Sequence, residues 1–292
     1  MDHRIIDNTL SLTTMPMGKK GYEAKYNYTD HIRTTEYHCH DFYEFYIHLH
    51  GGQYFGLDDH LYMLEPNQLF IIPPFSMHGI SSVSEMINYE RAYINISPEV
   101  LKILGCGQID LDQFFRSYTS RGEHCFQLTK QMSVQCVSQI RRLQESETSG
   151  KPLAGFQNYA VLMNFLVTVC DSLYNSKCVT SNVNSNSIIR DVLTYINNNY
   201  TQSLNMESLA KQFGISVSFL SHEFVRFTNR SVYDYILYRR VMLAKQMIQT
   251  DLTLNTIAYQ CGFNDYSNFL RIFKKLVGLS PSDYRKTLKK FR

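Results

Sequence analysis

The chain reads Leu209-Ala210-Lys211-Gln212-Phe213-Gly214-Ile215 and, about 48 residues later, Ile257-Ala258-Tyr259-Gln260-Cys261-Gly262-Phe263. Each copy has an alanine followed four positions later by a glycine, and each continues into an apolar pair four positions apart. Beyond the pair, serine, aspartate and tyrosine recur at equal offsets: Ser231, Asp234 and Tyr235 after Phe224, and Ser280, Asp283 and Tyr284 after Phe273. Matches at several fixed offsets identify an internal repeat.

Each copy of the repeat has the features of a helix-turn-helix. The alanine lets two helices approach closely, and the glycine permits the positive φ of a tight turn. Ser216 and Asp265 are placed to cap the next helix, which would enter the major groove of DNA. Between the copies, Ser231–Gln249 predicts a helix of about 19 residues, roughly 28 Å long. Neighbouring major-groove segments on one face of DNA lie about 34 Å apart, so this helix can hold two readers near that spacing. The alternative is an all-helical domain whose repeat reflects packing alone.

Charge is distributed unevenly along the chain, although the formal net charge is only +3. From Asn186 to Arg292 there are 15 lysine and arginine residues against 7 acidic residues, whereas Met1 to Ser185 has 14 against 19. A basic part joined to an acidic part indicates that one domain meets a polyanion and the other does not. Because the basic part coincides with the repeat, DNA is the expected polyanion.

Residues from about 188 to 290 resemble the AraC/XylS family of transcription regulators. The resemblance lies in Ile257-Ala258, Gly262-Phe263, Phe269, Phe273-Lys274, Gly278, Ser280-Pro281 and Tyr284-Arg285. It covers about a third of the chain and implies a monomeric unit of seven helices that carries both motifs. It also makes activation of transcription the expected mode of action.

Matching positions in that resemblance assign the residues that would face DNA bases. They are Ser218, Ser221 and His222 in the first recognition helix and Tyr266, Ser267, Asn268 and Arg271 in the second. Arginine can pair with guanine, asparagine with adenine, and serine with either. The first helix has no arginine, asparagine or glutamine at these positions, which favours a contribution from DNA shape. Candidate phosphate contacts are Arg226, Arg240, Lys274 and Lys275; the family pattern also allows Arg240 to support the linker helix instead.

The first two thirds of the chain predict a different architecture. Between residues 20 and 97, short apolar runs broken by turn residues predict strands at Phe42–Leu49, Tyr54–Leu57, Leu69–Ile72 and Tyr89–Ile96. Their number and spacing indicate a small β-barrel or sandwich. Apolar residues at helical spacing within Val134–Leu143 and Phe156–Leu173 predict two further helices.

The segment His38-Cys39-His40-Asp41-Phe42-Tyr43-Glu44, followed by Gly51, resembles the first cupin motif. In metal-binding cupins two histidines, a glutamate and a later histidine hold one divalent ion, here His38, His40, Glu44 and His78, and such ligands suit Zn, Fe, Mn or Ni. The second cupin motif departs from the pattern, because Pro66-Asn67 replaces the usual Pro-Gly and no asparagine follows His78 at the expected distance. We therefore expect these residues to line a polar pocket or to satisfy turn hydrogen bonds, and we expect no cofactor; a bound divalent metal is the alternative.

An effector pocket is the expected use of this barrel. Glu44, Tyr46 and His48 alternate along one strand and would share one face. Together with His38, His40 and His78 they would offer a carboxylate, a phenol and imidazoles, a lining that suits a sugar. The alternative is that this polar face points to solvent.

The expected fold class is therefore α+β and multidomain, with a cupin-like β-barrel and helices followed by an all-α domain. The expected boundaries are 1–97 for an effector-binding barrel, 98–175 for a helical dimerisation region, 176–187 for a linker and 188–292 for an AraC-type DNA-binding domain. Within the last domain the motifs are expected at about 206–228 and 253–277, on either side of a linker helix at about 231–249.

These features predict a sequence-specific DNA-binding transcription regulator, an activator, controlled by a small-molecule effector. The expected partners are double-stranded DNA, a second copy of the chain and, for an activator, RNA polymerase. Two alternatives stay open: a metal-dependent cupin enzyme fused to a DNA-binding domain, and a ligand-independent regulator whose barrel only dimerises. We do not expect an enzyme. No apolar run reaches about 18 residues and the N-terminus is not of signal-peptide type, so we expect a cytoplasmic protein with no membrane partner. The seven scattered cysteines contain no C-x-x-C pair, so we expect them to be reduced thiols.

Overall fold

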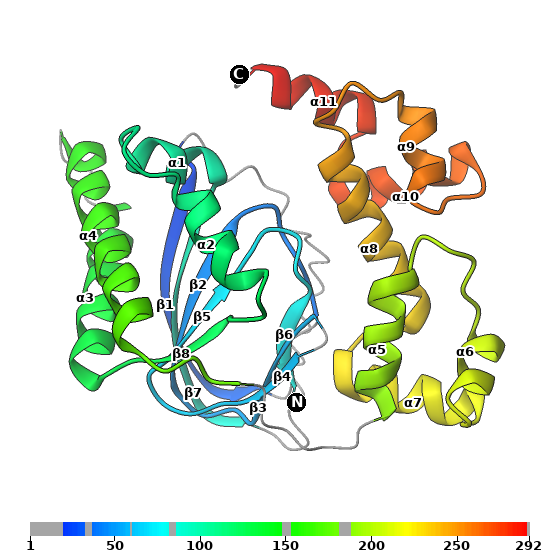
Figure 1. Cartoon of the computed structure of the whole chain (residues 1–292), viewed down its shortest axis with the longest axis horizontal. Helices are drawn as coiled ribbons and strands as arrows, with labels where there is room; N and C mark the ends of the chain where they lie inside the picture. Colours follow the sequence, from blue (N-terminus) through cyan, green and yellow to red (C-terminus); the bar gives the residue numbers. More distant parts are fainter. Residues whose placement is uncertain are drawn as a thin grey trace, which may run out of the picture.

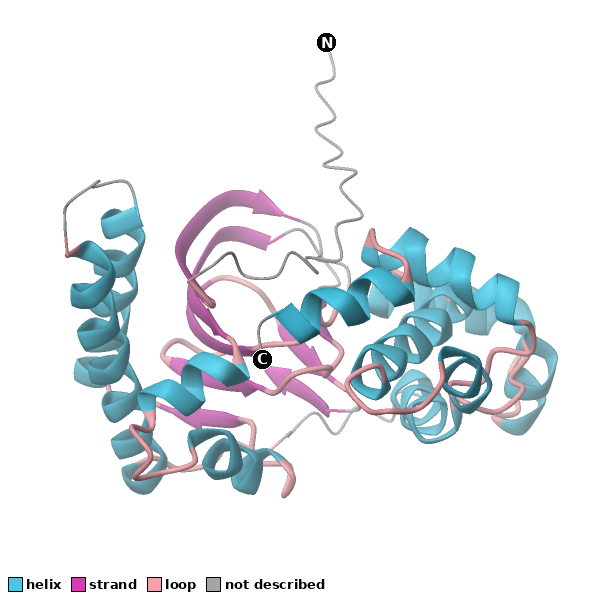
Figure 2. Ribbon diagram, turned by 90° about the horizontal axis from the view of Figure 1, so that it is seen from above, coloured by secondary structure: helices cyan, strands magenta, loops and turns pink. Residues whose placement is uncertain are grey.

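The computed structural model describes residues 20–32, 37–58, 60–81, 86–147, 153–180 and 188–290. Two parts lie side by side, a strand-rich N-terminal part and a helical C-terminal part (Figure 1). Seen from above, a pair of long helices covers one side of the sheets and the C-terminal helices lie on the opposite side (Figure 2). The predicted order of a β-rich domain followed by an all-α domain is confirmed.

Eight strands form two antiparallel sheets in the N-terminal part that the structure describes. The larger sheet has the order β1-β7-β2-β5-β8 and the smaller has the order β4-β3-β6. The strands are β1 (Tyr22–Ile32), β2 (Tyr43–His50), β3 (Tyr54–Leu57), β4 (His60–Met63), β5 (Gln68–Ile72), β6 (His78–Ser81), β7 (Met86–Ile96) and β8 (Cys125–Gln127). Four of these, β2, β3, β5 and β7, fall on the predicted strands.

Strand β2 lies in the middle of the larger sheet, and its side chains alternate between two apolar clusters. Phe45 and Ile47 pack with the helices that cover the outer face of that sheet. Tyr46 packs on the inner face with Phe55 and Phe70, between the two sheets. Because both faces of β2 are covered, the alternative that its polar face points to solvent is wrong: Glu44 is 8% exposed, Tyr46 3% and His48 1%.

The middle of the chain adds helices to this sheet. They are α1 (Pro98–Leu104), α2 (Leu111–Thr119), α3 (Lys130–Glu147) and α4 (Ala154–Asn175). The last two contain the two predicted helices, and their apolar residues, including Ile140, Leu143, Leu162 and Phe165, pack on the outer face of the larger sheet.

The sequence predicts a helical region over 98–175, and this prediction is wrong at residues 125–127, which form a strand. Strand β8 lies between α2 and α3 and pairs with β5 at the edge of the larger sheet, with Leu69 opposite Phe126. A three-residue strand is too short to show the alternation that identifies strands in a sequence, so pairing with an existing edge decides its conformation.

Seven helices follow among residues 188–290: α5 (Ile188–Asn199), α6 (Met206–Gln212), α7 (Val217–Thr228), α8 (Val232–Met247), α9 (Leu254–Gln260), α10 (Tyr266–Val277) and α11 (Pro281–Lys290). The long helix α8 runs from the group α5–α7 to the group α9–α11 (Figure 1). It has 16 residues rather than the 19 expected.

The repeat produces the local geometry expected of it. The Ser216 hydroxyl accepts a hydrogen bond from the Phe219 amide at 3.1 Å, and the Asp265 carboxylate accepts one from the Asn268 amide at 2.7 Å. Gly214 and Gly262 have φ of 66° and 87°. At Gly262 a Cβ would also lie 2.4 Å from the Thr201 carbonyl oxygen, so this turn requires glycine on two counts.

Candidate DNA-binding surface and histidine cluster

Helices α7 and α10 are the second helices of the two motifs, and they present the predicted base-facing residues at the surface. Ser218, Ser221 and His222 are exposed on α7. On α10, Ser267 and Arg271 are exposed, whereas Tyr266 and Asn268 are half-buried. The opposite face of each helix carries the core residues, with Leu220 and Phe224 on α7 and Phe269, Ile272 and Phe273 on α10. Burial of one face of each helix therefore leaves the predicted base-facing residues on the opposite, solvent-accessible side.

The basic side chains near these helices differ in how they are held. Arg271 donates a hydrogen bond to the Asn268 side-chain oxygen at 2.8 Å, so the two predicted readers of α10 lie together. Arg226 forms an ion pair with Glu223 at 3.2 Å. Lys274 and Lys275 lie in the last turn of α10 and are exposed.

Arg240 differs from the other candidate phosphate contacts. Its Nε donates to the Tyr200 carbonyl at 2.7 Å and its Nη2 to the Gln202 carbonyl at 2.8 Å. These bonds tie α8 to the chain that follows α5, which is the supporting role that the family pattern allowed. We accordingly leave Arg240 out of the proposed phosphate contacts.

Two apolar residues on the exposed face of α7, Val217 and Val225, were not among the residues predicted to face DNA. Val217 is 39% exposed and Val225 is 41% exposed, on either side of Ser221 along the helix. Valine methyl groups on a reading helix can contact thymine methyls. The sequence could have indicated this role, because the two valines do not fall on the buried stripe formed by Leu220 and Phe224.

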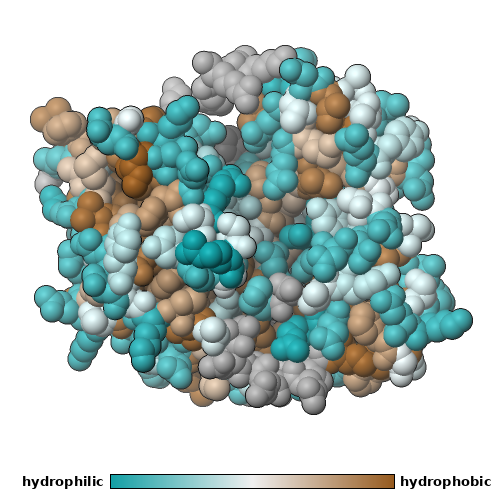
Figure 3. Space-filling view, in the orientation of Figure 1, coloured by the Kyte–Doolittle hydropathy of each residue, from teal (hydrophilic) through white to brown (hydrophobic). Residues whose placement is uncertain are grey.

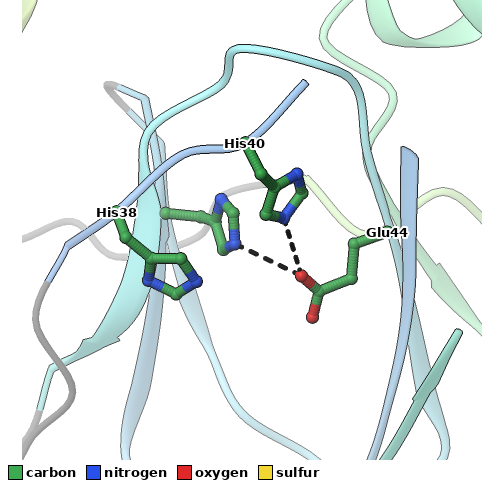
Figure 4. A group of neighbouring side chains, drawn as sticks. His38, His40 and Glu44 are labelled. Carbon is green, nitrogen blue, oxygen red and sulfur yellow. Dashed lines mark hydrogen bonds and ion pairs between the residues drawn. The ribbon is translucent and has the colours of Figure 1, made fainter. Parts of the chain in front are cut away.

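In the N-terminal part, four predicted residues from three places in the chain come together. His38 and His40 precede β2, Glu44 lies in β2, and His78 begins β6. We call these four residues the histidine cluster. The Glu44 carboxylate lies 2.9 Å from His40 Nε2 and 3.4 Å from His78 Nε2. The His38 and His78 ring centroids are 4.3 Å apart, and Figure 4 shows His38 directed toward the same point as His40 and Glu44.

Burial and hydrogen bonding set the ionisation of this cluster. Burial alone would raise the pKa of Glu44, but hydrogen bonds from His40 and His78 outweigh it and hold that pKa far below its ordinary value. Burial lowers the pKa of His40, against the opposing effect of its hydrogen bond to Glu44. Glu44 is therefore a carboxylate at neutral pH, which is the form in which this group accepts hydrogen bonds and binds cations.

The donor set fits a divalent transition-metal ion. One ligand atom from each of His38, His40, Glu44 and His78 lies within 4.8 Å of all the others, and His40, Glu44 and His78 are buried. Three imidazoles and one carboxylate are a donor set typical of Zn, Fe, Mn or Ni. The expectation that the cluster is only a polar pocket therefore needs a direct test.

Tyr46 and His48 continue the inward face of β2 beyond the cluster. The Tyr46 hydroxyl lies 2.6 Å from the Tyr89 hydroxyl, and the Tyr46 ring packs against Phe55 with centroids 5.1 Å apart. Burial lowers the pKa of His48 to about 4, with a smaller contribution from the nearby His50. The predicted effector residues of β2, which are Glu44, Tyr46 and His48, therefore share the face of the strand that points between the two sheets.

Comparisons with known proteins cover both parts of the chain. Residues 209–287 match the family described as a helix-turn-helix domain, and residues 21–155 match the family described as an AraC-like ligand binding domain. The chain is 33% identical over 102 residues to the regulatory protein SoxS of Escherichia coli (strain K12), covering 35% of this chain and 95% of SoxS.

Two other relatives show how far the similarity extends. The HTH-type transcriptional regulator YdiP of Escherichia coli (strain K12) is 38% identical over 103 residues, which is 35% of this chain and 34% of that protein. The HTH-type transcriptional activator RhaS of Pectobacterium carotovorum subsp. carotovorum (strain PC1) is 24% identical over 253 residues, 85% of this chain and 86% of RhaS. The match to YdiP thus spans about a third of that relative's length.

Among the described residues, no helix is both long and apolar enough to cross a membrane.

Proposed function

Because the chain belongs to the AraC/XylS family of transcription regulators, we propose that it binds specific DNA sequences through α7 and α10 and that a small molecule held by its N-terminal domain controls this binding. We propose that it acts in the cytoplasm. Regulation, rather than catalysis, is the activity that the family indicates.

The observation that carries the DNA-binding proposal is the pair of capped, surface-exposed helices held at the two ends of α8. A 16-residue helix is about 24 Å long, and the helices it connects add to that separation. Two readers that enter neighbouring major-groove segments on one face of DNA need to lie about 34 Å apart. The arrangement in Figure 1 supports this mode, because α7 and α10 flank α8 at opposite ends.

The proposed contacts follow from the exposed residues of each helix. Helix α10 has the stronger set for reading bases, with Arg271 for guanine and Asn268 for adenine, supplemented by Tyr266 and Ser267. Helix α7 offers Ser218, Ser221 and His222 and the exposed valines, which supports a larger share of shape readout there. Arg226, Lys274 and Lys275 are proposed to contact phosphates.

Selection of binding sites from a pool of random duplex DNA tests this proposal. We expect the full chain to enrich two short motifs whose centres lie about one helical turn apart. Insertion of about 5 base pairs between the motifs should abolish tight binding, because it rotates one motif to the other face of the duplex. Insertion of a full turn should also abolish it, because α8 is too short to span a second turn. Enrichment of no sequence would refute the proposal.

We propose that the chain forms a homodimer through α4. Its solvent face has Phe156, Ala160, Met163 and Val167, all exposed and spaced by four, three and four residues as in coiled-coil seams, and exposed Tyr174 follows seven residues after Val167. Phe156 is 77% exposed and Tyr174 is 72% exposed, which is unusual for such large apolar side chains. Apolar surface is visible on the side of the molecule where α3 and α4 lie (Figure 3). A second copy of α4 is the occupant that this spacing fits.

The proposed effector is a small molecule with several hydroxyl groups, such as a sugar, held between the two sheets by the inward residues of β2. Glu44, Tyr46 and His48 provide acceptors and donors there, with the three histidines of the cluster at one end. The name of RhaS as an activator supports activation as the mode, with RNA polymerase as a partner.

A thermal-shift panel of sugars and other small metabolites tests the effector proposal. A ligand at 100 times its Kd stabilises the folded protein by about 2.7 kcal/mol, so it should raise Tm by several degrees. The shift should be lost in Tyr46→Phe or His48→Asn and kept in Tyr28→Phe, an exposed tyrosine on β1. A panel with no shift would favour a barrel that only dimerises.

A further inference from the structure

Helices α7 and α10 correspond residue by residue, so each position of one helix can be compared with the same position of the other. Both helices have 12 residues. Their N-caps, Ser216 and Asp265, are 49 residues apart, and so are their C-caps, Asn229 and Gly278, which are both left-handed. The spacing of the repeat before the turn is one residue less, because the second turn is one residue longer. The structure therefore fixes an offset of 49 residues between the two reading helices.

At this offset the two polar readers of α10 have different counterparts on α7. Arg271 corresponds to His222, so that position stays polar, whereas Asn268 corresponds to Phe219, whose ring has no hydrogen-bonding group. Positions three residues apart on a helix lie on one face. On α10 this is seen directly, since Arg271 donates to the Asn268 side-chain oxygen at 2.8 Å. Phe219 thus occupies the position of a base reader, although it was not predicted to face DNA.

The Phe219 side chain lies outside the core of the DNA-binding domain. It is 46% exposed, whereas the next residue, Leu220, is 0% exposed. Leu220 and Phe224 belong to the core cluster of this domain, and Phe219 does not. A single exposed apolar side chain is common on protein surfaces and by itself indicates nothing. What distinguishes Phe219 is its register, which matches that of Asn268.

The charged neighbours of Phe219 on the outer side of α7 are paired with each other. His222 Nδ1, one turn after Phe219, lies 3.1 Å from the Glu223 carboxylate, and Arg226 Nη1, two turns after it, lies 3.2 Å from the same group. These partners weaken the repulsion between the Glu223 carboxylate and DNA phosphates. The side of α7 that carries Phe219 can therefore enter a groove without bringing an unpaired negative charge to the DNA.

The base edges of the major groove offer one apolar group to such a ring. Adenine, guanine and cytosine present hydrogen-bond donors and acceptors there, and thymine presents a carbonyl oxygen and its C5-methyl group. A phenyl ring over the cytosine amino group would bury that donor without a partner, which costs free energy. The ring gains by covering a methyl group, and an apolar contact of this kind distinguishes thymine from the other bases.

From this register and this chemistry we propose that Phe219 is a specificity-determining residue of α7 and reads the C5-methyl group of one thymine. The inference rests on the proposed DNA-binding function and names a base that the first motif selects. Equivalent positions of the two helices then select an A·T pair in opposite ways, because Asn268 binds the adenine and Phe219 covers the methyl group of the thymine. Methyl readout is thereby added to shape readout on the helix that has the weaker set of polar readers.

The methyl contact is tested with the full chain and a duplex enriched in the selection experiment. Each thymine is replaced, one at a time, by deoxyuridine, which keeps the base pairing and lacks only the methyl group. Burial of one methyl group corresponds to about a fourfold change in the binding constant. We expect a loss of this size at one thymine in the motif read by α7. 5-Bromodeoxyuridine at the same position should restore the affinity, since bromine is similar in size to a methyl group.

Substitution of Phe219 identifies the side chain that makes the contact. In Phe219→Ala, thymine and deoxyuridine at that position should be bound equally well, while the other thymines behave as with the wild-type chain. Combining the change in the protein with the change in the DNA isolates this one contact. Tyr233→Ala is the matched control, because Tyr233 is an aromatic residue that is 62% exposed on α8, outside both reading helices. It should keep the fourfold effect.

The position of the affected thymine provides an independent check. It must lie about one helical turn away from the base pair at which Arg271→Ala loses discrimination, because α7 and α10 read different motifs. If no motif is enriched, the proposed DNA-binding function itself fails. If two motifs are enriched but no thymine loses its methyl effect in Phe219→Ala, the role of Phe219 is refuted while DNA binding stands. A uniform loss of affinity in Phe219→Ala, equal with thymine and deoxyuridine at every position, would overturn it as well, since the ring would then support the helix rather than read a base.

Discussion

At the scale of single residues, the most informative side chains are those whose surroundings fix their ionisation or their partner. Arg271 and Asn268 lie together on the exposed face of α10, and Glu44 is a buried carboxylate between two imidazoles. These residues were identified from the sequence, because polar side chains at unusual positions in a repeat or a motif are visible there. Lys245 was not identified, although a lysine between Ala244 and Ile248 on the apolar side of a helix is a signal for a buried acidic partner.

Replacement of Arg271 by alanine should remove discrimination at one base pair, at a cost of about 1–3 kcal/mol against the preferred base. Lys274→Ala should instead weaken binding to all sequences and reduce the slope of log K against log salt by about 0.9. Binding isotherms on the selected site and its single-base variants, at several salt concentrations, measure both effects. Lys286→Ala on α11 removes one positive charge from the same domain and should change neither. Equal effects of the three variants would contradict the assigned roles.

Acid should destabilise the folded chain through His48. Its folded-state pKa is about 4, against about 6.5 for an unfolded chain, because burial disfavours the charged ring. Between these two values the unfolded chain takes up a proton that the folded chain does not, so the free energy of unfolding decreases as pH falls from 6.5 to 4. The contribution of His48 is fully present above pH 6.5 and amounts to about 3 kcal/mol.

Urea unfolding at a series of pH values, with chelator present, measures this dependence. The variant His48→Gln should show a smaller decrease between pH 6.5 and 4, whereas His222→Gln, at an exposed position on α7, should follow the wild-type curve. Parallel curves for wild type and His48→Gln would show that the buried imidazole is not the source.

At the scale of helices and strands, amphipathic patterns and caps explain most of the C-terminal half. The positions of α7 and α10 follow from Ser216, Asp265 and the two glycine turns. Helix α8 is three residues shorter than expected, because Ser231 is its N-cap rather than its first helical residue and the helix ends at Met247. Helix ends are the least certain part of any sequence-based assignment, since the last turn is decided by what packs against it.

The homodimer proposed through the exposed apolar row of α4 can be tested by changing one residue of that helix. Val167→Glu places a charge in the middle of the exposed apolar row of α4 and should convert a dimer into a monomer, because the charge cannot be buried against a second copy. Light scattering coupled to size-exclusion chromatography measures the mass of each species. Gln157→Glu, also exposed on α4 but outside the row, should remain dimeric. If Val167→Glu keeps the dimer mass, the interface lies elsewhere.

At the scale of the whole molecule, the position of the DNA-binding domain depends on buried polar contacts with the N-terminal domain, whose two sheets do not form the closed barrel expected from the sequence. Asp41→Ala leaves the Lys245 ammonium buried without its counter-charge, which costs about 3–5 kcal/mol when the partner stays in place. Undocking relieves this cost, so we expect two separate thermal transitions in the variant where the wild type shows one. Differential scanning calorimetry distinguishes the two cases.

The double variant Asp41→Leu with Lys245→Met should recover a single transition, since an apolar pair of similar volume can replace a buried ion pair. As a control, replacement of Lys25 or Glu23, which form a solvent-accessible ion pair on β1, should change the free energy of unfolding by less than about 1 kcal/mol. Two transitions in the double variant would show that the interface needs the charges themselves.

Local residue patterns alone predict the two helix-turn-helix motifs, their caps and turns, and the faces of α7 and α10 that point away from the core. These features are local: they depend on residues within one or two helical turns, and a repeat reveals them twice. Strand β8, the burial of the Glu44 face and the contacts of Tyr37 with Gly56 and Gly79 were decided only in the tertiary structure. Each depends on segments far apart in the chain, as does the ion pair of Asp41 with Lys245, and no local pattern encodes which distant surfaces meet.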